Sequence, residues 1–119
     1  MLNLDTHILL FALDGTLTPN ERKLLEKHRW GVSSIVLWEI AKLHQKGRIA
    51  VGLSSPLMAR TLEQIRVWPL SREVCVSMLS LDFSSDPADE LIAATSLTYG
   101  VPLVTRDARI RASKLVPFA

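Results

Sequence analysis

Short apolar segments alternate with longer stretches of helical periodicity along the whole chain. The first apolar segment, residues 1–4, leads directly into a helical pattern that begins after Asp5. Six further helices are predicted from periodicity and end signals, over residues 18–27, 34–47, 55–66, 71–79, 86–99 and 106–113. Four further short strands are predicted, over residues 30–33, 67–70, 101–105 and 115–118. This alternation is typical of an α/β protein with a mainly parallel sheet.

Two of the predicted helices carry clear start signals. Thr18, Pro19 and Glu21 have the spacing of a capping box with proline in the first helical position. In the helix that follows residue 85, Asp86 is expected to be the N-cap, with Asp89 in the first turn, where a negative charge is favoured. Residues 48–53 have no clear pattern, and residues 48–69 contain no identifying motif.

Composition limits the class of protein. The chain has 119 residues, of which 48% are hydrophobic and 22% are charged, so a single globular domain over residues 1–119 is expected. The longest apolar run has six residues, whereas a membrane-spanning helix needs about 20. One cysteine excludes an internal disulfide, and a reduced, cytoplasmic protein is expected. The net charge of +2 does not decide for or against nucleic-acid binding.

Three aspartates stand where a parallel sheet collects functional groups. Asp5 follows the first strand, Asp107 follows the strand that ends at Thr105, and Asp89 begins a helix. Groups beyond the carboxyl ends of parallel strands meet at one edge of the sheet. Each aspartate also has a simpler interpretation, because Asp5 and Asp89 can serve helix starts and Asp107 can be a turn residue.

Glu39 is the most informative acid. Its neighbours one helical turn away are apolar, so its carboxylate should be partly buried, which is unfavourable without a compensating charge, proton or metal. The alternative is an edge glutamate that reaches water or pairs with Lys42 or Lys46.

Residues 11–17 resemble the motif of the haloacid-dehalogenase phosphatases. That chemistry needs a nucleophilic aspartate where this chain has Ala12, so phosphoryl transfer to a carboxylate is excluded. Asp14 and Gly15 are interpreted instead as a turn that ends a helix.

Four segments in order resemble the PIN-domain family, in particular the small VapC-type toxins of toxin–antitoxin pairs: residues 2–7, 34–40, 86–94 and 102–107. The resemblance implies a three-layer α/β/α sandwich with a central, mainly parallel sheet, and a metal-dependent endoribonuclease. It places the catalytic acids at Asp5, Glu39, Asp89 and Asp107. Asp5, Asp89 and Asp107 are then the metal ligands, and Thr6 and Thr105 support them. Glu90 departs from the pattern, since many relatives carry arginine there.

The chemistry of the acidic set agrees with this resemblance. Two carboxylates about 4 Å apart repel by about 4 kcal/mol at an effective dielectric constant of 20, so a cluster of them needs a cation. Oxygen ligands favour Mg²⁺ or Mn²⁺ over Zn²⁺. The resemblance also implies the expected partners, which are an RNA substrate, a cognate antitoxin and a second copy in a homodimer. The alternatives are a PIN nuclease of RNA maturation without an antitoxin, and a catalytically silent module that binds RNA or protein.

Several other residues carry weaker expectations. Four basic residues near the C-terminal end are candidates for phosphate contacts, with a solvated helix face as the alternative: Arg106, Arg109, Arg111 and Lys114. Trp38 and Trp68 are expected to pack in the core or in a subunit contact, and Cys75 is expected in the core.

Overall fold

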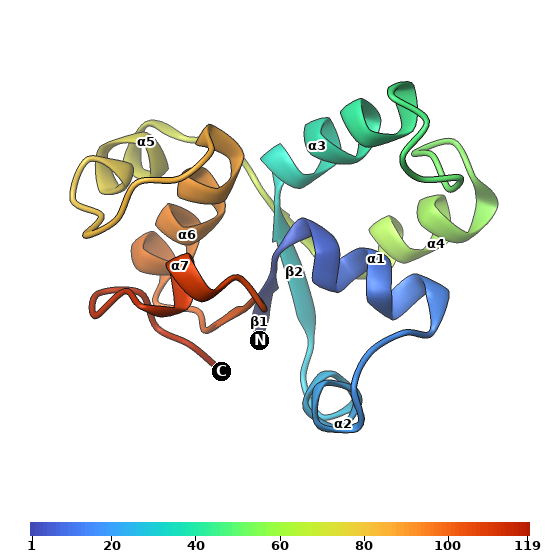
Figure 1. Ribbon diagram of the computed structural model, residues 1–119, viewed down its shortest axis with the longest axis horizontal. Helices are drawn as coiled ribbons and strands as arrows, with labels where there is room; N and C mark the ends of the chain where they lie inside the picture. The colour runs from blue at the N-terminus through green and yellow to red at the C-terminus, as the bar shows by residue number, and fades with distance from the viewer.

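The computed structural model describes residues 1–119 and contains four strands and seven helices (Figure 1). The strands are β1 (Leu2–Leu4), β2 (Trp30–Ser33), β3 (Arg66–Trp68) and β4 (Leu103–Val104). The helices are α1 (Thr6–Asp14), α2 (Pro19–Glu26), α3 (Ser34–Gln45), α4 (Pro56–Gln64), α5 (Arg72–Met78), α6 (Pro87–Tyr99) and α7 (Ala108–Arg111).

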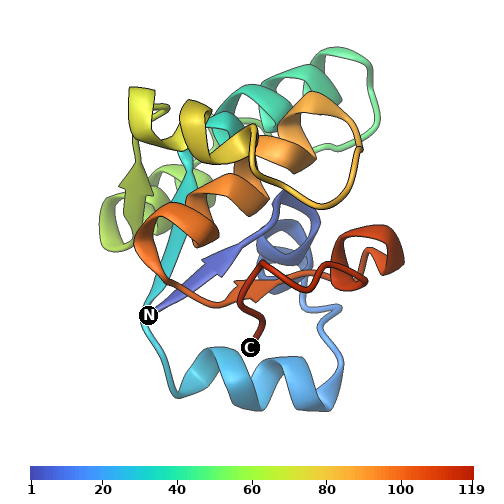
Figure 2. The same ribbon diagram turned by 90° about the vertical axis from the view of Figure 1, so that its left-hand side faces the viewer.

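All four strands are parallel, and their order across the sheet is β3-β2-β1-β4. In β1, Asn3 is paired with Gly31 of β2 on one side and with Leu103 of β4 on the other. Helices α5 and α6 lie on one side of the sheet and α1 and α4 on the other (Figures 1 and 2). The expected three-layer α/β/α arrangement is therefore confirmed, and the carboxyl ends of the strands share one edge.

Several of the predicted strands differ from the observed ones, and β4 spans only Leu103–Val104 of the predicted residues 101–105. β3 ends at Trp68 rather than at residue 70, because Pro69 has no backbone N–H to continue a ladder. The strand predicted over residues 115–118 is wrong, since only Phe118 forms a bridge, with Leu103. Pro117 likewise has no N–H and contributes only its carbonyl, which accepts from the amide of Leu103.

A buried asparagine fastens α6 to the central strand. Asn3 is fully buried in β1, and its Nδ2 donates to the carbonyl of Ile92 (3.0 Å) and to Oγ of Ser96 (2.9 Å). Asn3 stands two residues before Asp5, and Ile92 stands three residues after Asp89. These bonds therefore hold the first turn of α6 in a defined position relative to the end of β1.

The tryptophans and the cysteine have different environments. Trp68 is 3% exposed, stacks on Tyr99 and lies so close to Gly31 that a Cβ there would be 2.5 Å from its ring. Trp38 is 54% exposed, so it is not part of the core. The expectation that Cys75 packs in the core is wrong, because α5 turns the preceding Val74 inward and leaves Cys75 exposed. None of the seven helices combines the length and the apolar character that a membrane-spanning segment needs.

Candidate active site

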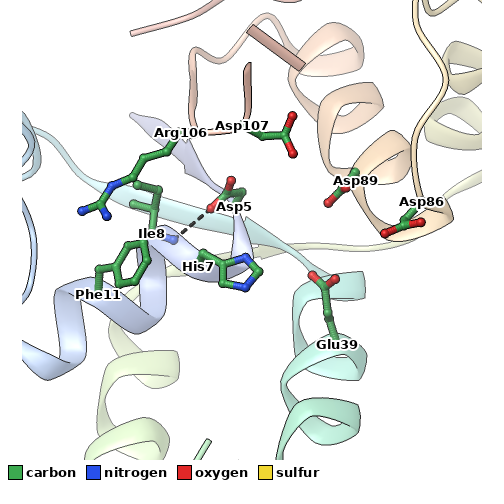
Figure 3. Close-up of a pocket in the computed structure, with 9 residues that line it drawn as sticks. All are labelled: Asp5, His7, Ile8, Phe11, Glu39, Asp86, Asp89, Arg106 and Asp107. Atoms are coloured by element: carbon green, nitrogen blue, oxygen red, sulfur yellow. Dashed lines mark hydrogen bonds between the residues drawn. The ribbon is translucent and has the colours of Figure 1, made fainter. Parts of the chain in front are cut away.

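A pocket of about 450 Å³ opens at the carboxyl edge of the sheet (Figure 3). All four acids that the sequence singled out line it, although they come from four separate parts of the chain: Asp5, Glu39, Asp89 and Asp107. The same pocket is lined by Asp86, His7 and Arg106. We refer to it below as the acidic pocket.

Asp5 both caps a helix and lines the pocket, so the capping interpretation and the functional interpretation of this residue do not exclude each other. It is the N-cap of α1, and its Oδ1 accepts from the amide of Ile8 (2.9 Å). The residue is only 8% exposed. Burial raises the pKa of the Asp5 carboxyl, while the Thr105 hydroxyl and the Ile8 amide partly oppose that rise. A buried carboxylate with these neighbours has a strong demand for positive charge.

Glu39 is half-buried on the inner side of α3, as its apolar neighbours predicted. Its Oε1 accepts a hydrogen bond from the Thr6 hydroxyl, which confirms that Thr6 contacts one of the acids. Burial is the main cause that raises the pKa of the Glu39 carboxyl. The alternative pairing with lysine is not observed, because the only ion pair in the chain joins Arg106 to Glu21.

Asp89 is positioned by a serine that the sequence analysis did not single out. Ser85 Oγ donates to Asp89 Oδ2 (2.9 Å), and the Ser85 amide donates to Glu90 Oε2 (3.2 Å). Burial raises the pKa of the Asp89 carboxyl, and the charges of Asp107 and Asp86 raise it further. The position of Ser85 directly before the Asp86-Pro87 helix start is the sequence signal that could have identified it.

The prediction that Asp86 is the N-cap residue of α6 is confirmed for its position but not for its side chain. Asp86 occupies the N-cap position but makes no side-chain capping bond. The acids of the first turn bond back to Ser85 instead, and the carboxylate of Asp86 faces the acidic pocket (Figure 3). Asp86 therefore adds a fifth carboxylate to this pocket.

Asp107 caps the short helix α7. Its Oδ1 accepts from the amides of Arg109 (2.9 Å) and Ile110 (3.1 Å). The hydroxyl oxygen of Thr105 accepts from the amide of Asp107 (3.1 Å). Thr105 thus contacts the backbone of one acid and acts on the carboxyl of Asp5, which places the predicted supporting hydroxyl between two acids.

Positive charge around the pocket is scarce. His7 lies between Asp5 and Glu39 in Figure 3, and its charge lowers the pKa values of Asp5, Glu39 and Asp89. Arg106 also lines the pocket but is bound to Glu21, with Nη2–Oε1 and Nε–Oε2 distances of 2.7 and 2.8 Å. Its guanidinium also lies 4.0 Å from the centre of the Phe11 ring. The acids are therefore left largely without neutralising partners.

The other three basic candidates do not line this pocket. Arg111 donates to the carbonyl of Thr105 (3.2 Å) and lies over the ring of Phe118. Arg109 and Lys114 have exposed side chains. Contact of these residues with RNA stays a prediction.

The pair formed by Glu21 and Arg106 predicts a modest, specific effect on stability. Glu21 also accepts from the Thr18 amide (2.8 Å) in the capping box, and glutamine preserves such a box. Glu21→Gln should therefore keep the helix start but lose the ion pair, which lowers the free energy of unfolding by about 0.2–1 kcal/mol. Urea titration of both proteins measures this change. The difference should shrink at high salt, and a loss of several kcal/mol would contradict the account.

The donor set of the acidic pocket fits a hard divalent cation. Every acid in it offers carboxylate oxygens, which Mg²⁺ and Mn²⁺ prefer. In the observed side-chain positions no three acidic, histidine or cysteine side chains converge closely enough to ligate one ion. A cation between the carboxylates would replace their mutual repulsion by attraction. Raised pKa values at Asp5, Glu39 and Asp89 show the same unmet demand for positive charge.

Comparison with known proteins agrees with this geometry. The model of the PIN domain family matches residues 3–114, and the chain belongs to that family. It is 32% identical over 88 residues to ribonuclease VapC22 of Mycobacterium tuberculosis, a match that covers 70% of this chain and 66%, just under two thirds, of that protein. The resemblance to the PIN-domain family noted from the sequence is thereby confirmed.

Solved structures share the fold over nearly the whole chain. VapBC2 from Rickettsia felis, bound to a DNA fragment from its promoter, has a TM-score of 0.76 at 19% identity and covers 100% of this chain and 98% of its own. FitAB bound to an IR36 DNA fragment has a TM-score of 0.76 at 20% identity, with 99% of this chain and 94% of its own covered. At this level of identity the likeness supports the α/β/α fold.

Proposed function

We propose that this protein is a metal-dependent endoribonuclease and the toxin of a type II toxin–antitoxin pair. The observation that carries the proposal is the convergence of Asp5, Glu39, Asp89 and Asp107 on one pocket at the carboxyl edge of the sheet. A chain that only needed to fold would gain nothing from gathering mutually repelling carboxylates there. Its likeness to a protein named as a ribonuclease supports the same reaction.

Each acid has a role that follows from its surroundings. Asp5, Asp89 and Asp107 would hold a divalent cation, Mg²⁺ or Mn²⁺. When bound, that cation supplies charge for the scissile phosphate and lowers the pKa of a water molecule. Glu39 is suited to accept the proton of the attacking water, because its pKa is raised and the Thr6 hydroxyl fixes one of its oxygens. The attacking water would displace the ribose 3′-oxygen, so that the P–O3′ bond breaks and the products carry a 5′-phosphate and a 3′-hydroxyl.

The proposal includes a protein inhibitor. The structural relatives with the same fold include VapBC and FitAB assemblies, and an antitoxin of this chain could place a basic side chain among the acids in the position of the cation. A homodimer, expected from the family resemblance, is part of the same proposal. A maturation nuclease without an antitoxin would share the chemistry, whereas a silent binding module would not cleave RNA.

The direct test is metal-dependent cleavage of RNA by the purified protein. Cleavage is expected with Mg²⁺ or Mn²⁺ and should stop when EDTA is added, because the acids repel both each other and the phosphate without a cation. The Asp5→Asn protein, purified in the same way, is the control for contaminating nuclease. Asparagine keeps the capping bond to the Ile8 amide, so this variant should stay folded and inactive. Equal cleavage by the parent protein with and without chelator would refute the metal mechanism.

A further inference from the structure

A second groove runs directly out of the acidic pocket. It has a volume of about 500 Å³ and shares His7, Glu39 and Asp86 with that pocket, so the two are continuous. From this boundary it extends along α3 toward the loop after that helix, past Lys46 and Arg48. We refer to it as the basic groove.

The α3 side of the basic groove combines one aromatic ring with positive charge. Trp38, Lys42 and Lys46 are spaced four residues apart, so they form a stripe on one face of α3. At a rise of about 1.5 Å per residue the stripe is about 12 Å long. Trp38 is 54% exposed, although tryptophan is usually buried in large part.

The cations of the basic groove have no acidic partners. Lys42 Nζ donates only to Oε1 of Gln45 (3.3 Å). Neither Lys46 nor Arg48 takes part in an ion pair, since the chain's one ion pair is that of Arg106 with Glu21. Positive charge next to an acidic pocket, left uncompensated by the acids of the protein, indicates that a polyanion is bound there.

We propose that the basic groove holds the single-stranded RNA that flanks the scissile bond, with phosphates along Lys42, Lys46 and Arg48 and a base stacked on Trp38. This inference rests on the proposed ribonuclease function and adds the path of the substrate. The acids of the pocket repel the phosphate of the scissile bond. That phosphate is joined to further phosphates on both sides along the RNA. The neighbouring phosphates therefore need an attractive route to that pocket. Stacking on one exposed ring requires an unpaired base, which selects a single strand over a duplex.

The charge contacts are tested by the salt dependence of RNA binding. Binding of a short, unstructured RNA is measured with Asp89→Asn protein, which should bind without cleaving. Adding Lys42→Gln and Lys46→Gln should reduce the slope of log K against log salt by about 1.4, or about 0.7 for each of two phosphate contacts. Between 1 M and 0.1 M salt, this difference in slope means that the affinity of the Lys42/Lys46 variant rises roughly 25-fold less than the affinity of the protein that keeps both lysines.

A matched control exists on another helix. Lys23 and Lys27 at the C-terminal end of α2 are exposed, are also four residues apart, and do not line the groove. The pair Lys23→Gln and Lys27→Gln makes the same change in net charge and should leave the salt slope near that of the parent. Equal slopes for the two pairs of substitutions would overturn the proposed groove.

Trp38 gives a second, independent readout. Trp30 is half-buried and Trp68 is buried, so RNA should quench mainly the fluorescence of Trp38, and Trp38→Phe should remove most of that quenching. Trp38→Ala should weaken RNA binding roughly 5- to 150-fold, the range found for loss of one stacked base. Unchanged quenching in Trp38→Phe protein would contradict the stacking contact.

The outcomes separate this inference from the proposed function. If the parent protein cleaves RNA with metal and the Lys42/Lys46 variant binds and cleaves like the Lys23/Lys27 control, the groove is wrong and the ribonuclease stands. If that variant also escapes inhibition by the antitoxin, the groove is a protein docking surface and the inference is refuted. If the parent protein cleaves no RNA with any metal, the proposed function fails, whatever the binding data show.

Discussion

Asp89→Asn is expected to lower the rate of RNA cleavage by about 100-fold or more, while the metal-free protein keeps its stability or gains some. The substitution removes one charge from a set of repelling carboxylates but preserves the shape of the side chain and its position next to Ser85. Loss of a metal ligand removes several kcal/mol of transition-state stabilisation, and each 1.4 kcal/mol corresponds to about tenfold in rate. Single-turnover cleavage and thermal melting of the metal-free protein measure the two effects.

Asp86→Asn is the matched control three residues earlier. Asp86 has no capping bond to lose, and asparagine serves an N-cap about as well as aspartate. This variant should therefore change melting and RNA cleavage far less than Asp89→Asn does, although it also removes one carboxylate charge from the pocket. If Asp89 only complemented the helix dipole, Asp89→Asn would reduce stability by about 0.3–1 kcal/mol and leave cleavage intact. That pattern would show that Asp89 serves the helix and not the reaction.

The metal-free protein is expected to become less stable as the pH rises from about 4 to neutral. The pKa values of Asp5, Glu39 and Asp89 are raised in the folded protein, so the folded state binds more protons than the unfolded chain in this range. Stability is then highest below the unfolded pKa values of about 4 and falls as each carboxyl ionises through its raised pKa. Melting temperature as a function of pH, in the presence of EDTA, measures this fall.

A divalent cation should reverse this loss at neutral pH. Mn²⁺ at about 100 times its Kd stabilises the folded state by about 2.7 kcal/mol, which raises the melting temperature by about 10 °C for a chain of this size. Near pH 4 the rise should be much smaller, because protons compete with the cation. Asp89→Asn should flatten both the pH dependence and the metal effect. An equal rise at both pH values would place the bound metal elsewhere.

The one strongly depressed acid acts in a different pH range. Arg106 lowers the pKa of Glu21 to about 2, so its contribution to stability is present above the unfolded pKa of about 4.3 and is lost as the pH falls toward 2. The effects of Glu21 and of the acidic pocket on stability have opposite signs, and the effect of Glu21 lies below the interval from pH 5 to 7. The slope in that interval therefore reports mainly the acidic pocket.

The local sequence determined which segments become helices and strands, and which acids are available. The capping box at Thr18 and Glu21, the turn at Asp14 and Gly15, and the apolar surroundings of Glu39 are properties of neighbouring residues, and the structure confirms all three. In the turn, Gly15 has a φ of 79° and Asp14 Oδ1 accepts from the Thr16 amide. Alternating elements also predicted the parallel sheet, because parallel strands need crossover helices.

Only the tertiary structure decided how the acids are used. Asp86 is the N-cap residue that its sequence predicted, but its side chain makes no capping bond and lines the pocket, while Ser85 donates to the carboxylates of Asp89 and Glu90. Arg106 is a predicted RNA contact, and only the structure shows that Glu21, 85 residues earlier, binds its guanidinium. Trp38 and Cys75 lie on helix faces whose exposure depends on how the helices are packed. Hydrogen bonds and burial between distant segments depend on three-dimensional distances, which local residue patterns do not contain.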